Sequence, residues 1–403
     1  MADVAKVSAR NNRATRSRSH GGKPLKIVLY FEFRTCILPI LGDLHMTTRL
    51  ISLALLAGVS LLPIAAQPAS AAGATPMFLT LPMQESGRPA APGHQPAALQ
   101  TWNGTITYKG LTHPYTMVGT NPKKSNATTT VTVYLIPVKL VYGANNGNMT
   151  FDPLVDQANG VSIMQNLLNS PLFNALDWTW GGTDFGTTQY LDAFQRGSFW
   201  RDVSGKNPDY HVMLAPSVLS EVTLTVSQSQ GSVIKNPLGG GVVGTFDLTT
   251  FNADAQAWLQ SFSSINPGAL AMFVTDNIYL TSGHICCVGG YDTVENNGQT
   301  YSYATYETAA GSFSQDISGF SRELGNWMDD PLLTSTSPCG ALDVGAPAGD
   351  FANYGTFPVT FGGVTWHPQD LAWLEYFTAP KNFSGNNWLD DQHLLKRYCQ
   401  GEQ

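Results

Sequence analysis

Charged residues are scarce in this sequence. Asp, Glu, Lys and Arg make up 13% of the 403 residues, which is about half the share in an ordinary globular protein. Glycine is plentiful, with 39 residues, and Thr, Ser and Asn are also common. This combination is typical of an exported protein and argues against a cytosolic one.

The sequence also lacks a long uninterrupted apolar run. The most apolar stretch, residues 50–66, is broken by Pro63 and is short for a membrane span. It follows a basic start at Met46 and precedes the small residues Ala69, Ser70 and Ala71. That order predicts a secretory signal peptide at 46–71 that is cleaved after Ala71, with an uncleaved membrane anchor as the alternative. Residues 1–45 are interpreted as a disordered basic leader or a misassigned start.

Positive charge is concentrated before the predicted cleavage site. Residues 1–71 hold nine of the 22 Lys and Arg but three of the 29 Asp and Glu, so the remainder has 13 basic and 26 acidic residues and a formal charge of −13. Such an acidic chain is a poor partner for nucleic acid or an anionic membrane surface. We therefore expect a secreted protein, extracellular or periplasmic, with no nucleic-acid partner and no stable membrane span. An unknown protein or polysaccharide is the expected partner.

Cysteine is rare and no C-x-x-C pair is present, which disfavours a cysteine zinc site. Cys36 lies in the leader, and Cys286, Cys287, Cys339 and Cys399 remain after export. An even number in an oxidising compartment predicts two disulfides. Because a bridge between adjacent cysteines closes a strained ring, we expect Cys286 and Cys287 to bond to Cys339 and Cys399, in either order.

The rest of the chain predicts one α+β domain at 101–403, preceded by a linker at 72–100 rich in Pro, Ala and Gly. Alternating patterns predict strands at 101–119 and 127–143, where Pro137 suggests an edge or a bulge. Apolar residues three and four apart predict helices at 162–176, 187–203 and 252–263. Apolar strands at 269–280 and 299–308 then lead to a further helix. The domain is therefore expected to contain a mixed sheet and a strand-rich N-terminal part.

That helix, "SGFSRELGNWMDDP" at 318–331, carries the central motif. Its apolar stripe leaves Arg322 and Asn326, four residues apart, on another face. In the zincin signature two metal ligands have this spacing and a Glu, here Glu323, follows the first as general base. A guanidinium and an amide are poor zinc ligands. The segment "SPCGALDVGAPAGD" then returns the carboxylate of Asp343 toward the helix.

"GFSRELGNWMDDP" and "CGALDVGAP" resemble the H-E-L-x-E-x-x-x-D-P helix and the C-x-x-x-E-[IV]-G-D segment of a group of secreted bacterial zincin-like proteins. "CCVGGY" and "WHPQDLAWLEYF" extend the resemblance over residues 272–377. It implies a zincin-like core, with a mixed sheet and a motif-bearing helix, and an ancestry among zinc metallopeptidases. Glu323 would then be the candidate general base.

Several ligand positions depart from that family. Arg322 replaces its His, Asn326 its second ligand, Asp343 its downstream Glu, and Asp292 stands where the family has another His. Because a zinc hydrolase needs about three protein ligands, we expect no bound metal and no catalysis. We hypothesise that Arg322 places a permanent positive charge where the metal would lie, balanced by Glu323, Asp343 or Asp292.

Two functions follow from this motif. The first is a secreted protein of metallopeptidase-like ancestry that is inactive, has no cofactor, and plays a binding or structural role outside the cell. The alternative is an active secreted hydrolase, such as a peptidase, with an atypical zinc or carboxylate site that uses Glu323, Asp343, His284, Asp292 or His367. A lone histidine beside aromatic residues is, however, more often packed and hydrogen-bonded than metal-bound.

Overall fold

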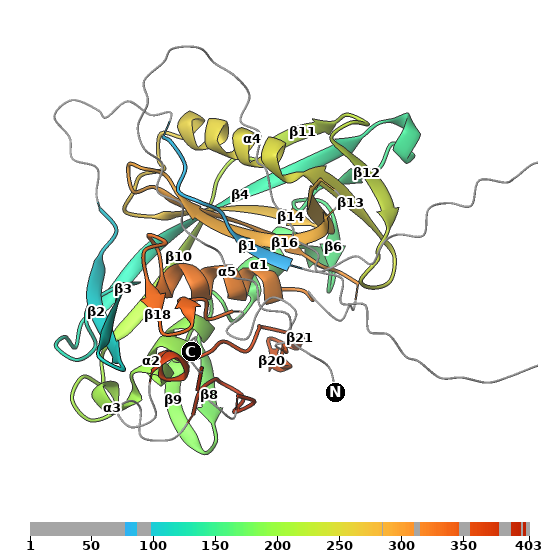
Figure 1. Cartoon of the computed structure of the whole chain (residues 1–403). Coiled ribbons are helices and arrows are strands. Elements are labelled where there is room, and N and C mark those ends of the chain that lie inside the picture. Colours follow the sequence, from blue (N-terminus) through green and yellow to red (C-terminus); the bar gives the residue numbers. More distant parts are fainter. Residues whose placement is uncertain are drawn as a thin grey trace, which may run out of the picture. The chain divides into compact units, whose positions relative to one another are not determined.

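The computed structural model describes residues 77–86, 98–283, 285–309, 315–345, 355–378, 388–395 and 398–399, all within one compact unit. An 11-stranded sheet forms its centre, with eight strands in the order β10-β4-β14-β17-β16-β15-β13-β12 and with β1, β5 and β11 paired alongside (Figure 1). The strands of this sheet are β1 (Met77–Thr80), β4 (Thr128–Tyr142), β5 (Thr150–Phe151), β10 (His211–Val218), β11 (Val222–Val226), β12 (Gly231–Lys235), β13 (Val242–Asp247), β14 (Leu270–Asp276), β15 (Ile278–Ser282), β16 (Ile285–Val294) and β17 (Thr300–Tyr306).

Five two-stranded pairs and a few helices surround the sheet. The pairs are β2 (Thr101–Tyr108) with β3 (Leu111–Val118), β6 (Gln157–Ala158) with β7 (Val161–Ser162), β8 (Leu176–Trp180) with β9 (Thr183–Thr188), β18 (Thr336–Ser337) with β19 (Gly340–Ala341), and β20 (Val359–Phe361) with β21 (Val364–Trp366). The helices are α1 (Ile163–Asn169), α2 (Tyr190–Ser198), α3 (Trp200–Val203), α4 (Leu248–Ser261) and α5 (Ser318–Asp329), with short 3-10 turns at Ala144–Asn146 and Leu374–Phe377. Over the described ranges, no helix is both long and apolar enough to cross a membrane.

The expected α+β zincin-like fold is wrong. Strands dominate the described residues, which form a large mixed sheet with five α-helices, closer to an all-β architecture. One reason is that helical periodicity at 162–176 and 187–203 overstated the helices. The hairpin β8–β9 separates them, and Gly181 and Gly182 at its turn both have positive φ, which glycine adopts without steric cost.

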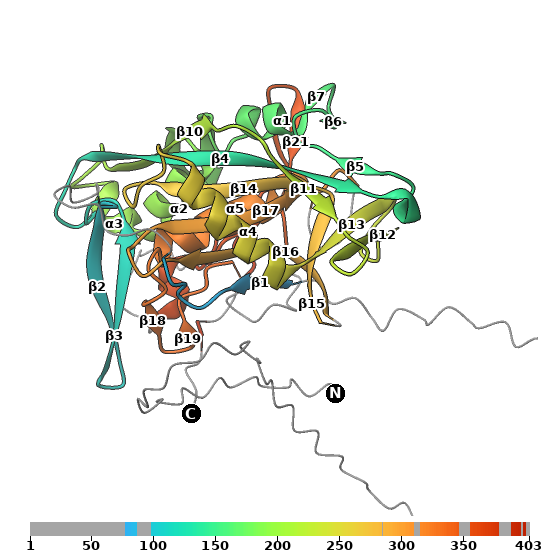
Figure 2. The same ribbon diagram turned by 90° about the horizontal axis from the view of Figure 1, so that it is seen from above.

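The two faces of the sheet are covered by different helices. Alternate residues of β14 supply the two cores, since Met272 belongs to the core that includes α5 and Phe273 to the core that includes α4. Accordingly, α4 and α5 lie on opposite sides of the sheet in Figures 1 and 2, while the β2–β3 hairpin projects from one end. The predicted helices at 252–263 and 318–331 are confirmed as α4 and α5.

Strand β4 lies inside the sheet, so the expectation that Pro137 marks an edge is wrong. β4 pairs with β14 on one side, and there Pro137 stands opposite Val274. On its other side β10 pairs as far as Leu135 and β11 begins at Val138. Pro137, which has no N–H to donate, therefore lies between the part of β4 that pairs with β10 and the part that pairs with β11.

The segment expected to be a linker contains a strand of the sheet. β1 runs parallel to β16, and Gln84 forms a further parallel bridge to Glu295. Thr80 lies opposite Asp292 in this register. The pairing therefore carries Phe78 and Thr80 to the end of β16 that faces the motif-bearing helix.

Two disulfides are present, but the expected pairing is wrong. Cys286 bonds to Cys287, and Cys339 bonds to Cys399 with a Cα–Cα distance of 6.0 Å. The adjacent cysteines pack in a small cluster with Val243 and Tyr279, whereas Cys339 and Cys399 belong to the core on the α5 face. The two pairs occupy different parts of the fold, so they do not meet.

Candidate functional site

The motif-bearing helix α5 is buried along its whole length and packs on β16 and β17. Arg322 and Asn326 are 4% and 5% exposed, so the polar face of the helix is covered. The polar positions of the motif are therefore interior groups that need partners.

Arg322 has those partners. Its Nη1 donates to the carbonyl oxygen of Gly345 at 3.2 Å, and its Nη2 lies 3.2 Å from Asp343 Oδ2. Nε lies 3.9 Å from Glu323 Oε1, and the guanidinium carbon is 4.5 Å from the centroid of the Phe78 ring. Two carboxylates, a carbonyl and an aromatic face thus surround one buried cation.

The neighbouring loop depends on a glycine and on Asn326. A Cβ added at Gly345 would lie 2.5 Å from Arg322 Cγ, so only glycine permits this close approach. The N–H of Gly345 donates to Asn326 Oδ1 at 3.0 Å. Asn326 therefore holds the loop that brings Asp343 to Arg322.

Glu323, the candidate general base, is 0% exposed. It lies against β16, where a Cβ at Gly290 would be 2.8 Å from Glu323 Oε1. A general base has to reach the proton that it removes, directly or through one water. Its burial fits a partner of Arg322 better than a base that meets substrate.

A cavity of about 90 Å³ lies beside this cluster. Three residues singled out in the sequence, Asp292, Asn326 and Asp343, line it. The other lining residues are Thr80, Asp330, Leu333, Ser335, Ala341 and Leu342. The structure therefore brings part of the predicted site together around one space.

Carboxylates dominate the polar lining of the cavity. Burial, above all, raises the pKa of Asp292 to about 7; nearby Asp343 and Asp330 act in the same direction, while the hydrogen bond from Thr80 opposes the rise. Burial also raises the pKa of Asp330, which accepts the N–H groups of Thr334 and Ser335. From the sequence, Asp330 and Pro331 were interpreted as the end of the helix, and a place for Asp330 beside the site was not predicted.

His367 does not line this cavity. His367 Nδ1 lies 2.6 Å from Asp316 Oδ2, and its backbone N–H donates to Asp316 Oδ1. His367 is therefore paired with a residue that precedes α5. His284 lies outside the described residues.

The residues present do not fit a zinc ion. Within the described ranges, no three His, Cys, Asp or Glu side chains are grouped so that they could hold a metal. The guanidinium of Arg322 stands at the first ligand position and cannot give up its proton to bind one. Asp343 is committed to that guanidinium, so no zinc-dependent step is derived for this site.

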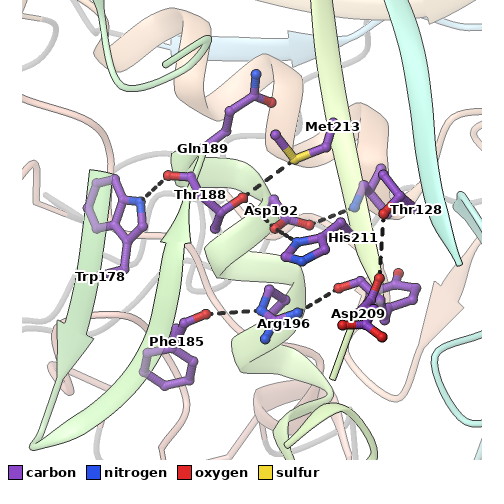
Figure 3. Close-up of polar contacts among 12 residues, drawn as sticks. Thr128, Trp178, Phe185, Thr188, Gln189, Asp192, Arg196, Asp209, His211 and Met213 are labelled. Carbon is purple, nitrogen blue, oxygen red and sulfur yellow. Dashed lines mark hydrogen bonds and ion pairs between the residues drawn. The ribbon is translucent and has the colours of Figure 1, made fainter. Parts of the chain in front are cut away.

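A second buried polar cluster, not predicted from the sequence, lies around Asp192 on α2 (Figure 3). Asp192 Oδ2 accepts the Thr188 hydroxyl at 2.7 Å and lies 2.6 Å from His211 Nδ1, while Oδ1 accepts the Val212 N–H at 2.6 Å. One turn later, Arg196 donates to the carbonyl oxygens of Phe185, Pro208 and Tyr210.

This second cluster is a structural clamp. Both oxygens of the fully buried Asp192 are occupied, and its partners come from the end of β9 and the start of β10. Buried polar groups with complete partners fix the relative position of the elements that carry them. One signal in the sequence could have indicated this cluster, namely an Asp among the apolar residues of an amphipathic helix.

No protein-family model, no curated protein and no solved structure matches this chain. The family resemblance therefore rests on the motif residues themselves, and the function has to be argued from the geometry around Arg322.

Proposed function

We propose that the protein is a secreted, non-catalytic binding protein whose zinc-peptidase-like helix carries a buried arginine in place of a metal site. The observation that supports this is the ion pair of Arg322, 4% exposed, with Asp343 at 3.2 Å. Asp343 is also one of the positions at which a metal ligand was expected.

The chemistry of the guanidinium separates this proposal from the hydrolase alternative. Arginine stays protonated, so its guanidinium cannot ligate a metal. A buried cation without carboxylate partners would cost several kcal/mol. Glu323 and Asp343 are therefore best explained as counter-ions, which leaves neither available as a base or a ligand.

Metal content tests the proposal. The protein is produced with its own export signal, purified without chelator, and assayed for metals beside the double variant Arg322→His/Asn326→Glu and the charge-preserving control Arg322→Lys. We expect less than 0.1 metal per chain, on the order of background, in the natural protein and in the control, and about one zinc in the double variant.

A natural protein that already holds one metal per chain would overturn the proposal and favour the hydrolase. Failure of the folded double variant to take up zinc would show that the position of Arg322 is not that of a lost metal ligand.

A further inference from the structure

We propose that the cavity beside Arg322 binds a primary alkylammonium group, such as the end of a lysine side chain or a free amine. This inference deepens the proposed binding role and rests on it. Three features of the cavity support it: its size and depth, its mixed lining, and its charge.

The cavity is small and reaches the surface at one end. Its volume of about 90 Å³ is several times the roughly 10–15 Å³ that one water molecule needs by the same measure. Asp343 at the outer end has a side chain that is 31% exposed, whereas Asp292 is 4% exposed. A short alkyl chain fits a space of this size.

The lining is mixed in a way that suits such a chain. Leu333, Ala341 and Leu342 offer apolar surface against which methylene groups can pack, as they do along a lysine stem. A hydrated metal ion would gain nothing from these walls. The described carboxylates are also not grouped around one point as a metal requires, whereas an ammonium needs only one or two acceptors within reach.

The charge of the surroundings favours a cation. Asp292, Asp330 and Asp343 all line the cavity. Arg322 is paired with Asp343 at 3.2 Å and lies 3.9 Å from Glu323, so Asp292 and Asp330 are the carboxylates that a cationic ligand would meet. Ionised carboxylates so close together repel one another in a poorly solvated site. An ammonium placed among them offsets that repulsion and forms charge-assisted hydrogen bonds.

The deepest carboxylate is already oriented. The Thr80 hydroxyl donates to Asp292 Oδ1 at 2.9 Å, which fixes the plane of the carboxylate. The raised pKa of Asp292 reflects burial first and then the neighbouring Asp343 and Asp330. A cationic ligand would stabilise the ionised form of this group.

The test uses two probes of nearly equal shape, n-butylammonium and the neutral n-butanol, titrated into the mature protein at constant ionic strength set with tetramethylammonium chloride. Binding is followed by the methyl and amide resonances of residues around the cavity. We expect saturable binding of butylammonium and none of butanol over the same range. This contrast needs no variant, so it does not depend on how any variant folds.

Matched substitutions locate the site. Asp292→Asn should weaken butylammonium binding at least about tenfold, the loss expected for a charge-assisted hydrogen bond. The same substitution at the exposed Asp184 should leave binding unchanged. Equal binding of butanol, equal loss in both variants, or no binding of butylammonium would each overturn the proposal.

Titrations with two further ligands distinguish a metal site from an amine site, and a polypeptide from a free amine. Calcium that binds stoichiometrically and excludes butylammonium would identify a metal site and overturn the proposal. Tighter binding of Nα-acetyl-lysine methylamide than of butylammonium would identify a polypeptide source, and weaker binding a free amine. A natural protein that contains a metal yet still binds butylammonium would defeat the proposed function while leaving this cavity site intact.

Discussion

Two equally buried aspartates behave differently in this molecule. Asp192 is 0% exposed and is met by a hydroxyl, an imidazole and a backbone N–H. Asp292 is 4% exposed and accepts the Thr80 hydroxyl, but it shares a cavity with Asp330 and Asp343. The first carboxylate completes a closed network, and the second lines a cavity together with two other carboxylates.

The difference shows how a carboxylate that stabilises the fold is distinguished from one that a ligand could reach. Burial alone does not separate them, since both are interior. What separates them is whether donors or further acceptors surround the carboxylate, and whether space remains beside it. Four substitutions test that distinction, from the largest expected effect to the smallest.

Removing the buried cation beside the cavity should have the largest effect. Arg322→Met leaves Glu323 and Asp343 without their counter-ion, and breaking a buried pair typically costs about 3–5 kcal/mol. Unfolding by urea, followed by fluorescence and circular dichroism, measures the loss. As a control, Lys206→Met removes an exposed partner at 3.9 Å from Asp202 and should change nothing measurable. Equal effects would mean that the buried pair is not special.

Opening the disulfide near the cavity should come next. The double variant Cys339→Ser/Cys399→Ser releases a link across 60 residues, for which loop-closure entropy predicts a loss of about 4 kcal/mol or somewhat less. The control, Cys286→Ser/Cys287→Ser, removes a disulfide between adjacent residues. That disulfide closes too short a loop for a comparable entropic effect. Hydrogen exchange should rise at residues 333–345 and stay unchanged around Asp192. A larger loss in the control would contradict the entropic account.

Weakening the hydrogen-bond network around Asp192 should lower the free energy of unfolding by less than either of these changes. Asp192→Asn replaces the charge-assisted hydrogen bonds with His211, Thr188 and Val212 by weaker ones. It also points an amide N–H group at these donors, so we expect the free energy of unfolding to fall by about 2 kcal/mol. Denaturant unfolding measures it beside Asp184→Asn on the surface. If both variants have the stability of the natural protein, the Asp192 network is not a clamp.

The smallest effect, that of a substitution at Asp292, should be a gain in stability at high pH, whereas the other three variants lose stability. The pKa of Asp292 is raised from 3.8 to about 7, so the folded state holds this proton more tightly than the unfolded chain. Its contribution favours folding below about pH 4, is lost as the pH rises toward 7, and is then constant. Asp292→Asn should therefore flatten the stability profile between pH 4 and 7.

Above pH 7 the variant should be more stable than the natural protein by about 1–2 kcal/mol, a figure set by the pKa change and discounted for relaxation. Thermal unfolding at pH 5 and pH 8 checks it. A variant that is less stable at pH 8 would place Asp292 in the same class as Asp192.

The sequence predicted the helix that carries the site but not its surroundings. The apolar stripe of α5 specifies a helix, because it depends on spacing along the chain. Its other face looked open because Arg322 and Asn326 are polar. Their burial depends on the loop at Asp343 and Gly345, which is brought in by contacts that no local pattern records.

Long-range pairing also explains the other differences. The strand content was underestimated because local patterns do not record pairing, whereas β4 pairs with four different strands. The cysteine pairing depended on which core each cysteine joined. Asp192 was overlooked because a polar residue in an amphipathic helix normally faces water, and here its partners come from two other strands.

The cavity draws its walls from distant parts of the chain, because Thr80 comes from the first strand and the other lining residues lie between Asp292 and Asp343. During synthesis, these parts can meet only after the segment up to Asp343 has left the ribosome. The cavity would therefore form late, when the central sheet and α5 are already outside the ribosome.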